Sequence, residues 1–278
     1  AVAALESGVI TPSSIIQDKG VYTFYEYPQP WCWVWPLGYT HGRVNVSDAI
    51  AVSCNYFFYE VGRLTGIQTI DDYATQFGLG RSTGIEIGDS KGALASPEYA
   101  EAHDLEWTDG QTLTAAIGQS YSLFTPLQLA NYVATLAGGG TRYNAHLLKE
   151  VRTYDSAELV DGYDEPPAEI IDIEPENLQA VLQGMRDLVV SGSVAYYFKD
   201  CVVDAAAKTG TAQTGGKVSN GVFVAFAPYD DPQIALAVVI EKGGSGGALA
   251  STAVQILNAY FTSVDEAKAV VGENMLIQ

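Results

Sequence analysis

Helical and strand-like spacings of apolar residues alternate along the 278 residues of this chain, which predicts a mixed fold of helices and strands. Segments with helical spacing begin after a capping residue or a proline, and several end at a glycine. The expected helices span residues 1–6, 47–52, 55–64, 69–77, 127–136, 175–190 and 249–261. Ser47-Asp48 is expected to cap the second of these helices, and Thr125-Pro126 the fifth.

Three apolar runs near the end of the chain have the length and composition of strands, at residues 201–208, 218–227 and 233–241. The short turn Pro228-Tyr229-Asp230-Asp231-Pro232 joins the last two runs, so we expect an antiparallel hairpin. The helix at 249–261 would then cover one face of the sheet. The expected fold class is therefore α/β of the α+β type, an antiparallel sheet covered by helices.

Two segments lack a regular period. Residues 22–38 are crowded with aromatic residues and prolines, which fits an irregular or hairpin-like flap. Such a flap either faces a partner or substrate, or packs its rings on the domain, and packing is the favoured alternative. Residues 152–167 are acidic and contain Pro166-Pro167, which indicates a surface connection within one domain rather than a domain boundary.

Composition excludes several classes of function. The net charge of −19 repels a polyanion such as nucleic acid from most of the surface. No run of 18 apolar residues is present to span a bilayer. The glycine-rich stretches lack the phosphate-loop and dinucleotide-binding patterns. We therefore expect a chain that is soluble as given and uses no nucleotide cofactor.

The cysteines and histidines give little indication of disulfide bonds or of a metal site. The cysteines are Cys32, Cys54 and Cys201, and the histidines are His41, His103 and His146. Three cysteines cannot all pair within one molecule, and a bridge between the first two stays open. The histidines are scattered without the spacing of metal ligands, so no metal site is expected.

Lys208-Thr209-Gly210 and Ser53-Cys54-Asn55 carry the strongest chemical signal. They match K-T-G and S-x-N, two of the three signatures of serine enzymes that transfer acyl groups from D-alanyl peptides and β-lactams. The third signature, S-x-x-K, is absent, because none of the eight lysines has a serine three residues before it. Each short match also has a structural explanation: an edge-strand lysine beside a bulge glycine, a helix cap and a turn residue.

Further blocks of sequence place these motifs in a fixed order. They are His41-Gly42, Ser53-Cys54-Asn55-Tyr56-Phe57-Phe58-Tyr59, Phe77-Gly78-Leu79-Gly80, Thr83-Gly84-Ile85, Ala116-Ile117-Gly118-Gln119-Ser120, Thr125-Pro126-Leu127-Gln128-Leu129-Ala130, Lys208-Thr209-Gly210-Thr211-Ala212-Gln213 and Phe223-Val224-Ala225-Phe226-Ala227-Pro228. Together they make residues 1–262 resemble the transpeptidase domain of class B penicillin-binding proteins. The block around Ser53 is most similar to the elongation-type members.

The resemblance implies the fold shared by penicillin-binding proteins and serine β-lactamases, with residues 1–278 as one transpeptidase domain. Ala1-Val2-Ala3-Ala4-Leu5-Glu6 resembles the segment just after the S-x-x-K lysine, within the helix that carries the nucleophile. By this comparison the domain is N-terminally truncated and lacks the early strands, part of that helix, the pedestal region and the membrane anchor. Either the gene is truncated or the first part of the protein was lost or left out.

The resemblance also implies roles for the matched residues. Ser53 would relay protons to the leaving group, and Asn55 would hydrogen-bond the substrate backbone. Lys208 would stabilise developing negative charge and help to anchor the substrate carboxylate. Thr209 and Thr211 would offer hydroxyls to that carboxylate, and the Thr211 N–H would form half of the oxyanion hole.

Glycine at position 210 has its own physical reason. A side chain there would project from the strand against the substrate, so Gly210 lets the backbone and a ligand approach closely. Gly118-Gln119 either supports the site or forms a buried turn before the Thr125 helix.

The function implied by the resemblance is that of a peptidoglycan D,D-transpeptidase in bacterial cell-wall synthesis and cell shape. Such an enzyme cross-links stem peptides ending in D-Ala-D-Ala through a serine acyl-enzyme, and β-lactams acylate it. No cofactor is implied. Elongation-complex or divisome proteins are the implied partners, and the extracytoplasmic face of the cell membrane is the implied location. Without S-x-x-K, this chain alone is expected to be inactive.

Two other functions stay open. One is a D,D-carboxypeptidase or β-lactamase of the same fold, in which water replaces the amine acceptor. The other is a non-catalytic binding or scaffold module that keeps the pocket without the nucleophile. Missing early strands should also leave one edge of the sheet unpaired, which favours a dimer.

Overall fold

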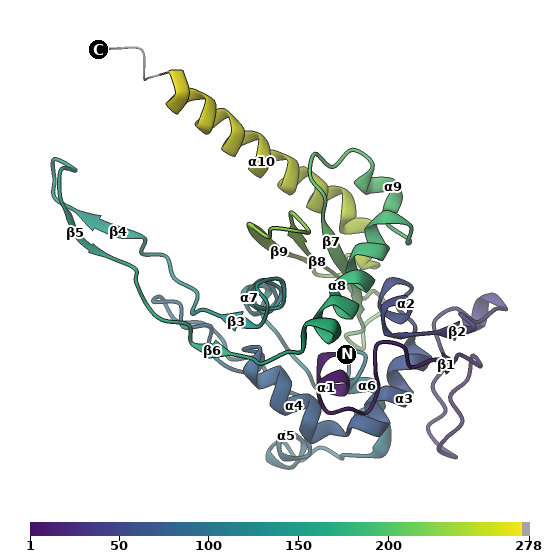
Figure 1. The fold of residues 1–278 in the computed structure, drawn as a ribbon. Helices are drawn as coiled ribbons and strands as arrows, with labels where there is room; N and C mark the ends of the chain where they lie inside the picture. Colours follow the sequence, from purple (N-terminus) through teal and green to yellow (C-terminus); the bar gives the residue numbers. More distant parts are fainter. Residues whose placement is uncertain (274–278) are drawn as a thin grey trace.

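An antiparallel sheet of three strands stands at the centre of the computed structural model, which describes residues 1–273 (Figure 1). The strands lie in the order β7 (Ala206–Ala212), β8 (Asn220–Ala227) and β9 (Ile234–Ile240). The predicted hairpin of the last two strands is confirmed. β7 begins later than the predicted residue 201, because the Val202 N–H is bound to Asn258 on the last helix instead of to a strand.

Residues of β8 point alternately into two hydrophobic cores, one on each face of the sheet. Val224 and Phe226 belong to the first core. Phe223, Ala225 and Ala227 belong to the second. Because β8 is the middle strand and is covered on both faces, its sequence is almost entirely apolar.

Three long helices lie around the sheet (Figure 1) and contribute residues to the two cores. They are α7 (Pro126–Ala137), α8 (Pro175–Val190) and α10 (Ala250–Glu273). α7 packs on β8 and β9, and α8 packs on β7. The predicted closing helix is confirmed as α10, whose Ala253 and Leu257 are fully buried in the second core.

Shorter elements surround this centre. The helices are α1 (Val2–Glu6), α2 (Val46–Ala51), α3 (Asn55–Thr65), α4 (Ile67–Gln76), α5 (Pro97–Ala102), α6 (Asp109–Ala115), η1 (Trp35–Leu37), α9 (Ala195–Phe198) and η2 (Gly246–Leu249). Short strands pair as β1 (Ile16–Gln17) with β2 (Arg43–Val44), β3 (Thr141–Arg142) with β6 (Glu169–Ile170), and β4 (Glu150–Arg152) with β5 (Leu159–Gly162).

Helix ends agree with the sequence where the capping signal is strong. The Thr125 hydroxyl and the Gln128 side chain form a reciprocal capping box at the start of α7, as its predicted cap requires. The predicted cap of α2 at Ser47 is wrong. Asn45 and Asp48 form the capping box there, and the Ser47 hydroxyl donates to the Ala180 carbonyl of α8.

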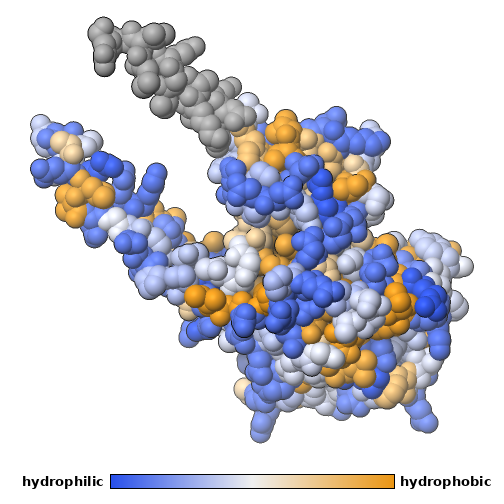
Figure 2. Space-filling view, viewed as in Figure 1, coloured by the Kyte–Doolittle hydropathy of each residue, from blue (hydrophilic) through white to orange (hydrophobic). Residues whose placement is uncertain are grey.

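The segment predicted as a surface connection, residues 152–167, overlaps the β4–β5 hairpin, which extends away from the body as an arm (Figure 1). Both strands are exposed along their length. Hydrophobic and hydrophilic side chains are mixed on the arm (Figure 2). An isolated hairpin buries little surface, so its strand signal in the sequence is weak.

In the aromatic segment at 22–38, some side chains pack on the domain and others are exposed, so both alternatives that its sequence left open apply to part of it. Tyr22 and Val34 are buried, which fits packing on the domain. The indole rings are about half exposed, at Trp31, Trp33 and Trp35. The Trp33 indole N–H donates to the Val52 carbonyl, so part of this segment lies beside the end of α2.

The close packing of α8 on α2 depends on Gly184. A Cβ at this position would lie 2.6 Å from the Ser47 carbonyl oxygen and 2.7 Å from the Ile50 Cβ. We expect Gly184→Ala to lower the free energy of unfolding by about 1–3 kcal/mol through overpacking, despite the higher helix propensity of alanine. Urea denaturation measures this change.

Gly162→Ala is the matched control, because a Cβ there meets its nearest neighbour at 3.9 Å. It should change the unfolding midpoint little. A Gly184→Ala protein as stable as the wild type would contradict the packing argument.

Candidate active site

Ser53 occupies a strained backbone position between two helices. The N–H of Cys54 bonds to the Ala49 carbonyl, and the N–H of Ser53 bonds to the Ile50 carbonyl. This pair of bonds is a Schellman motif, which ends α2 and places Ser53 at the residue that usually is glycine. Ser53 has φ of 54°, in the left-handed region. A serine at this position costs about 1–2 kcal/mol relative to glycine, which is typical of a residue kept for function.

The Lys208 ammonium contacts the Ser53 hydroxyl directly, across 155 residues of sequence. The same nitrogen donates to the Thr209 carbonyl at 3.1 Å. Burial lowers the pKa of Lys208 to about 8. The lysine therefore holds a proton that it can release near neutral pH, and its nearest side-chain acceptor is a serine.

Asn55 lies at the first turn of α3, one residue beyond Cys54. The junction of α2 and α3 thus carries Ser53 and Asn55 together, while β7 carries Lys208, Thr209, Gly210 and Thr211. Contact between Lys208 and Ser53 brings these two groups of predicted residues to one place.

The free edge of β7 presents backbone groups of alternate residues. The carbonyl of Thr209 accepts from Lys208, and the carbonyl of Thr211 accepts from the Gln119 side chain at 2.9 Å. In an antiparallel strand, the N–H and the C=O of one residue point to the same edge. The Thr211 N–H therefore faces the same edge as these carbonyls, where an oxyanion donor is expected.

Gly210 has a neighbour inside the protein that the sequence did not reveal. A Cβ there would lie 3.3 Å from the Val222 Cβ on β8. Gly246 of η2 also packs against the Gly210 backbone, since a Cβ on Gly246 would come within 2.2 Å of its carbonyl oxygen. Close packing of the strand against η2 thus favours a small residue independently of any substrate.

Four side chains with metal-ligand chemistry converge next to this site: Asp18, Cys32, His41 and Cys54. Their ligand atoms lie within 4.8 Å of one another. The scattered histidines gave no sign of this cluster, because its members are separated by 9 to 14 residues along the chain, without the short spacing of a metal motif.

The shortest separations in the cluster are of the size found between ligands of one small metal ion. His41 Nδ1 lies 3.0 Å from the Asp18 carboxylate and 3.3 Å from Cys32 Sγ, and Cys54 Sγ lies 3.7 Å from that carboxylate. Ligands of a tetrahedral zinc ion, at bond lengths of about 2.0–2.3 Å, are separated by roughly 3.3–3.8 Å. Two sulfurs with one nitrogen and one oxygen are typical of zinc rather than of magnesium or calcium.

An ion at this cluster would have a structural role. Four protein ligands close the coordination shell and leave no position for a substrate. Such an ion would fasten the segment from Asp18 to His41 onto Cys54, the residue after Ser53. The cysteines are free and their sulfurs lie 4.0 Å apart, so they form no Cys32–Cys54 disulfide here.

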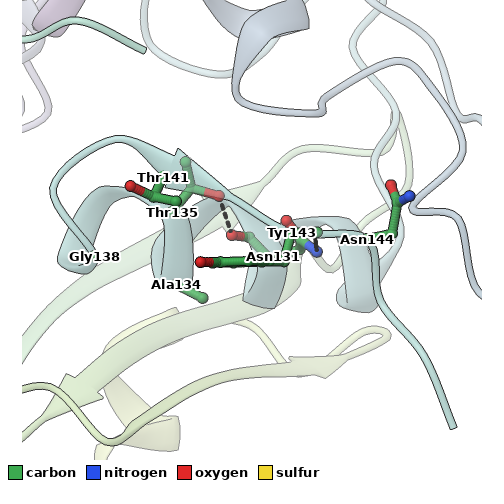
Figure 3. A pocket seen from close by; sticks show the side chains of 7 residues that line it. All are labelled: Asn131, Ala134, Thr135, Gly138, Thr141, Tyr143 and Asn144. Carbon is green, nitrogen blue, oxygen red and sulfur yellow. Dashed lines mark hydrogen bonds between the residues drawn. The ribbon is translucent and has the colours of Figure 1, made fainter. Parts of the chain in front are cut away.

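A separate hollow of about 370 Å³ lies between α7 and β3 (Figure 3). Its lining residues are Asn131, Ala134, Thr135, Gly138, Thr141, Tyr143 and Asn144. Asn131 donates to the Tyr143 carbonyl across it. No carboxylate or basic side chain lines this hollow, and none of the residues predicted for catalysis does.

Comparison with known proteins decides the family. The model of the penicillin-binding protein transpeptidase domain matches residues 1–260. The chain belongs to this family. The transpeptidase domain is 30% identical over 285 residues to the peptidoglycan D,D-transpeptidase MrdA of Escherichia coli, an alignment that covers 93% of this chain and 43% of the relative.

Solved structures agree with the fold of this transpeptidase domain. Penicillin-binding protein PBP2 of Pseudomonas aeruginosa, in complex with WCK 5153, matches with a TM-score of 0.83 and 31% identity, over 93% of this chain and 58% of that one. PBP2 of Helicobacter pylori, in complex with MreC, matches with a TM-score of 0.81 and 24% identity, over 94% and 47%. The predicted fold class is confirmed.

The transpeptidase domain spans less than half the length of the curated relative described above. Among the helices of residues 1–273, none is long and apolar enough to cross a membrane.

The lowered pKa of Lys208 gives a pH-dependent stability. The unfolded lysine holds its proton up to about pH 10.5, whereas the folded one loses it near pH 8. Between these values the unfolded state binds more protons, so stability rises with pH. The quantity to compare is the difference between the free energies of unfolding of the wild type and of Lys208→Met. We expect this difference to increase by on the order of 1–3 kcal/mol between pH 8 and pH 10.5.

Urea denaturation at several pH values measures this difference, and other titrating groups cancel in it. Lys217→Met, at an exposed lysine, is the control and should show no such slope. A flat difference for Lys208→Met would contradict a desolvated amine.

The cysteine–histidine cluster predicts a bound metal. We expect inductively coupled plasma mass spectrometry to find about one zinc ion per chain in protein purified without chelator. Addition of a chelator should lower the midpoint of thermal unfolding. His41→Ala should lose most of the zinc. His103→Ala, at an exposed histidine, should retain it. Protein that takes up no zinc when zinc is supplied would rule the site out.

Proposed function

We propose that this chain is the transpeptidase domain of an elongation-type peptidoglycan D,D-transpeptidase. The contact of Lys208 with Ser53 is the observation that carries the proposal. It supports a shared cleft between the α2–α3 junction and β7, where the two motifs of the family meet.

The reaction begins with attack by a serine oxygen on the penultimate D-alanine carbonyl of a stem peptide. The serine O–C bond forms, the peptide C–N bond breaks, and the released D-alanine amine takes a proton. An amine of a second stem peptide then attacks the acyl-enzyme, which forms the new C–N bond and returns the serine with its proton. Ser53 passes the proton to the leaving amine, and Lys208 stabilises the negative charge that develops in each step.

The remaining predicted residues orient the substrate. Asn55 hydrogen-bonds the substrate backbone from the start of α3. The hydroxyls of Thr209 and Thr211 bind the terminal carboxylate together with Lys208. The Thr211 N–H, which faces the free edge of β7, donates to the oxyanion. Gly210 has no side chain, so it allows the substrate to approach the backbone of β7 between Thr209 and Thr211.

The nucleophilic serine is not among residues 1–278, because no S-x-x-K occurs in them. We therefore propose that this polypeptide by itself forms no acyl-enzyme. The intact site would combine Ser53, Asn55 and Lys208 with a serine and a lysine supplied by sequence outside these residues.

Partners and location follow from the proposed role. The resemblance to MrdA and to a PBP2 bound to MreC supports stem peptides as substrates and elongation-complex proteins as partners, on the extracytoplasmic face of the membrane. Within the described residues no strand pairs with the outer edge of β9. This edge is the place where we propose that further strands, or a second copy, complete the sheet.

Acylation by a fluorescent penicillin tests the function. The gene product expressed with its natural upstream sequence should be labelled covalently, whereas the 278-residue chain should not. In the longer product, Ser53→Ala should slow acylation about 100-fold or more, since it removes a proton-transfer group.

Ser90→Ala is the matched control, because Ser90 is an exposed serine of a loop. It should react at the wild-type rate. Unchanged acylation of Ser53→Ala, or a labelled band on the 278-residue chain that survives denaturation, would overturn the proposed roles.

A further inference from the structure

The Gln119 side chain occupies the free edge of β7 at the candidate active site. Its Nε2 donates to the Thr211 carbonyl at 2.9 Å, and its Oε1 accepts from the Gln213 N–H at 3.3 Å. A carboxamide that donates to one residue and accepts from the residue two positions on makes the same pair of bonds as the backbone of an added strand. Gln119 thus pairs with β7 as the N–H and C=O of one residue in an added parallel strand would.

The loop that carries Gln119 is held in an unusual conformation. Its neighbours Gly118 and Ser120 both have positive φ, at 77° and 66°. For the serine, this region is unfavourable by about 1–2 kcal/mol. The Ser120 hydroxyl donates to the Gln111 side chain at 3.1 Å, which fixes the loop. Two residues in the left-handed region around one glutamine direct its side chain to the strand.

We propose that Gln119 is a place-holder for the substrate on β7 and selects ligands that carry a backbone amide. This inference rests on the proposed function. An extended peptide that pairs with the edge must donate its N–H to the Thr211 carbonyl, the acceptor that Gln119 uses in the free protein. The ligand therefore exchanges its amide for that of Gln119, whereas a ligand without such an amide leaves Gln119 in place.

Exchange keeps the edge satisfied in both states. Without a ligand, Gln119 covers the Thr211 carbonyl and the Gln213 N–H, which otherwise form a short unpaired edge. With a peptide bound, the partly exposed glutamine turns to water. Removal of the Gln119 side chain should therefore increase the reactivity of amide-bearing ligands selectively, because only these ligands compete with it for the Thr211 carbonyl.

The test compares two β-lactams on the gene product with its natural upstream sequence. Benzylpenicillin carries an acylamino side chain whose amide N–H can donate to the Thr211 carbonyl, and penicillanic acid has no nitrogen substituent at that ring position. We expect Gln119→Ala to raise the ratio of their second-order acylation rates about three- to tenfold in favour of benzylpenicillin, the factor that corresponds to one net hydrogen bond.

Gln179→Ala is the matched control, because Gln179 is an exposed glutamine on α8 bonded to the Tyr229 hydroxyl. It should leave the ratio unchanged. Gln119→Glu keeps an acceptor for Gln213 but loses the donor to Thr211, so it should raise the ratio as well.

A ratio that falls or stays constant in Gln119→Ala, with wild-type protein fully reactive, would overturn the place-holder role alone. Equal slowing with both compounds would indicate a merely structural glutamine and would also overturn it. Wild-type protein that reacts with neither β-lactam would overturn the proposed function, and this inference with it.

Discussion

Contact between the Lys208 amine and the Ser53 hydroxyl is the constraint on which the candidate site depends. One group comes from the edge of the sheet and the other from the turn between α2 and α3. Neither element can move without separating the two groups. The hydrophobic cores on both faces of β8 fix the strand side, and the packing of α2 on α8 fixes the helix side.

The site concentrates features that oppose folding. Ser53 is held in a left-handed conformation, and Lys208 is buried with its pKa lowered to about 8. Both are tolerated because their surroundings are tightly packed: a Schellman motif ends α2, and Cys54, the residue after Ser53, belongs to the Asp–Cys–His–Cys cluster. Ser53 and Lys208 thus lower the stability locally, and the elements that hold them restore it.

Local signals in the sequence predicted the long helices and strands and the two motifs. They did not predict contacts between residues that irregular segments bring together. α8 begins and ends as predicted at Pro175 and Val190, because its apolar period and its proline are unambiguous. The cluster at Asp18 and His41 depends on the path of a loop without a period, so spacing gave no signal. The cap at Asn45 was missed because Ser47, an equally good capping residue, bonds to another helix.

Helix α8 touches both halves of the cleft, since it packs on α2 through Gly184 and on β7 along the sheet. It therefore acts as a spacer that sets the separation of the turn that carries Ser53 from the strand that carries Lys208. A substitution such as Gly184→Ala therefore changes how Ser53 and Lys208 meet, although it alters neither residue.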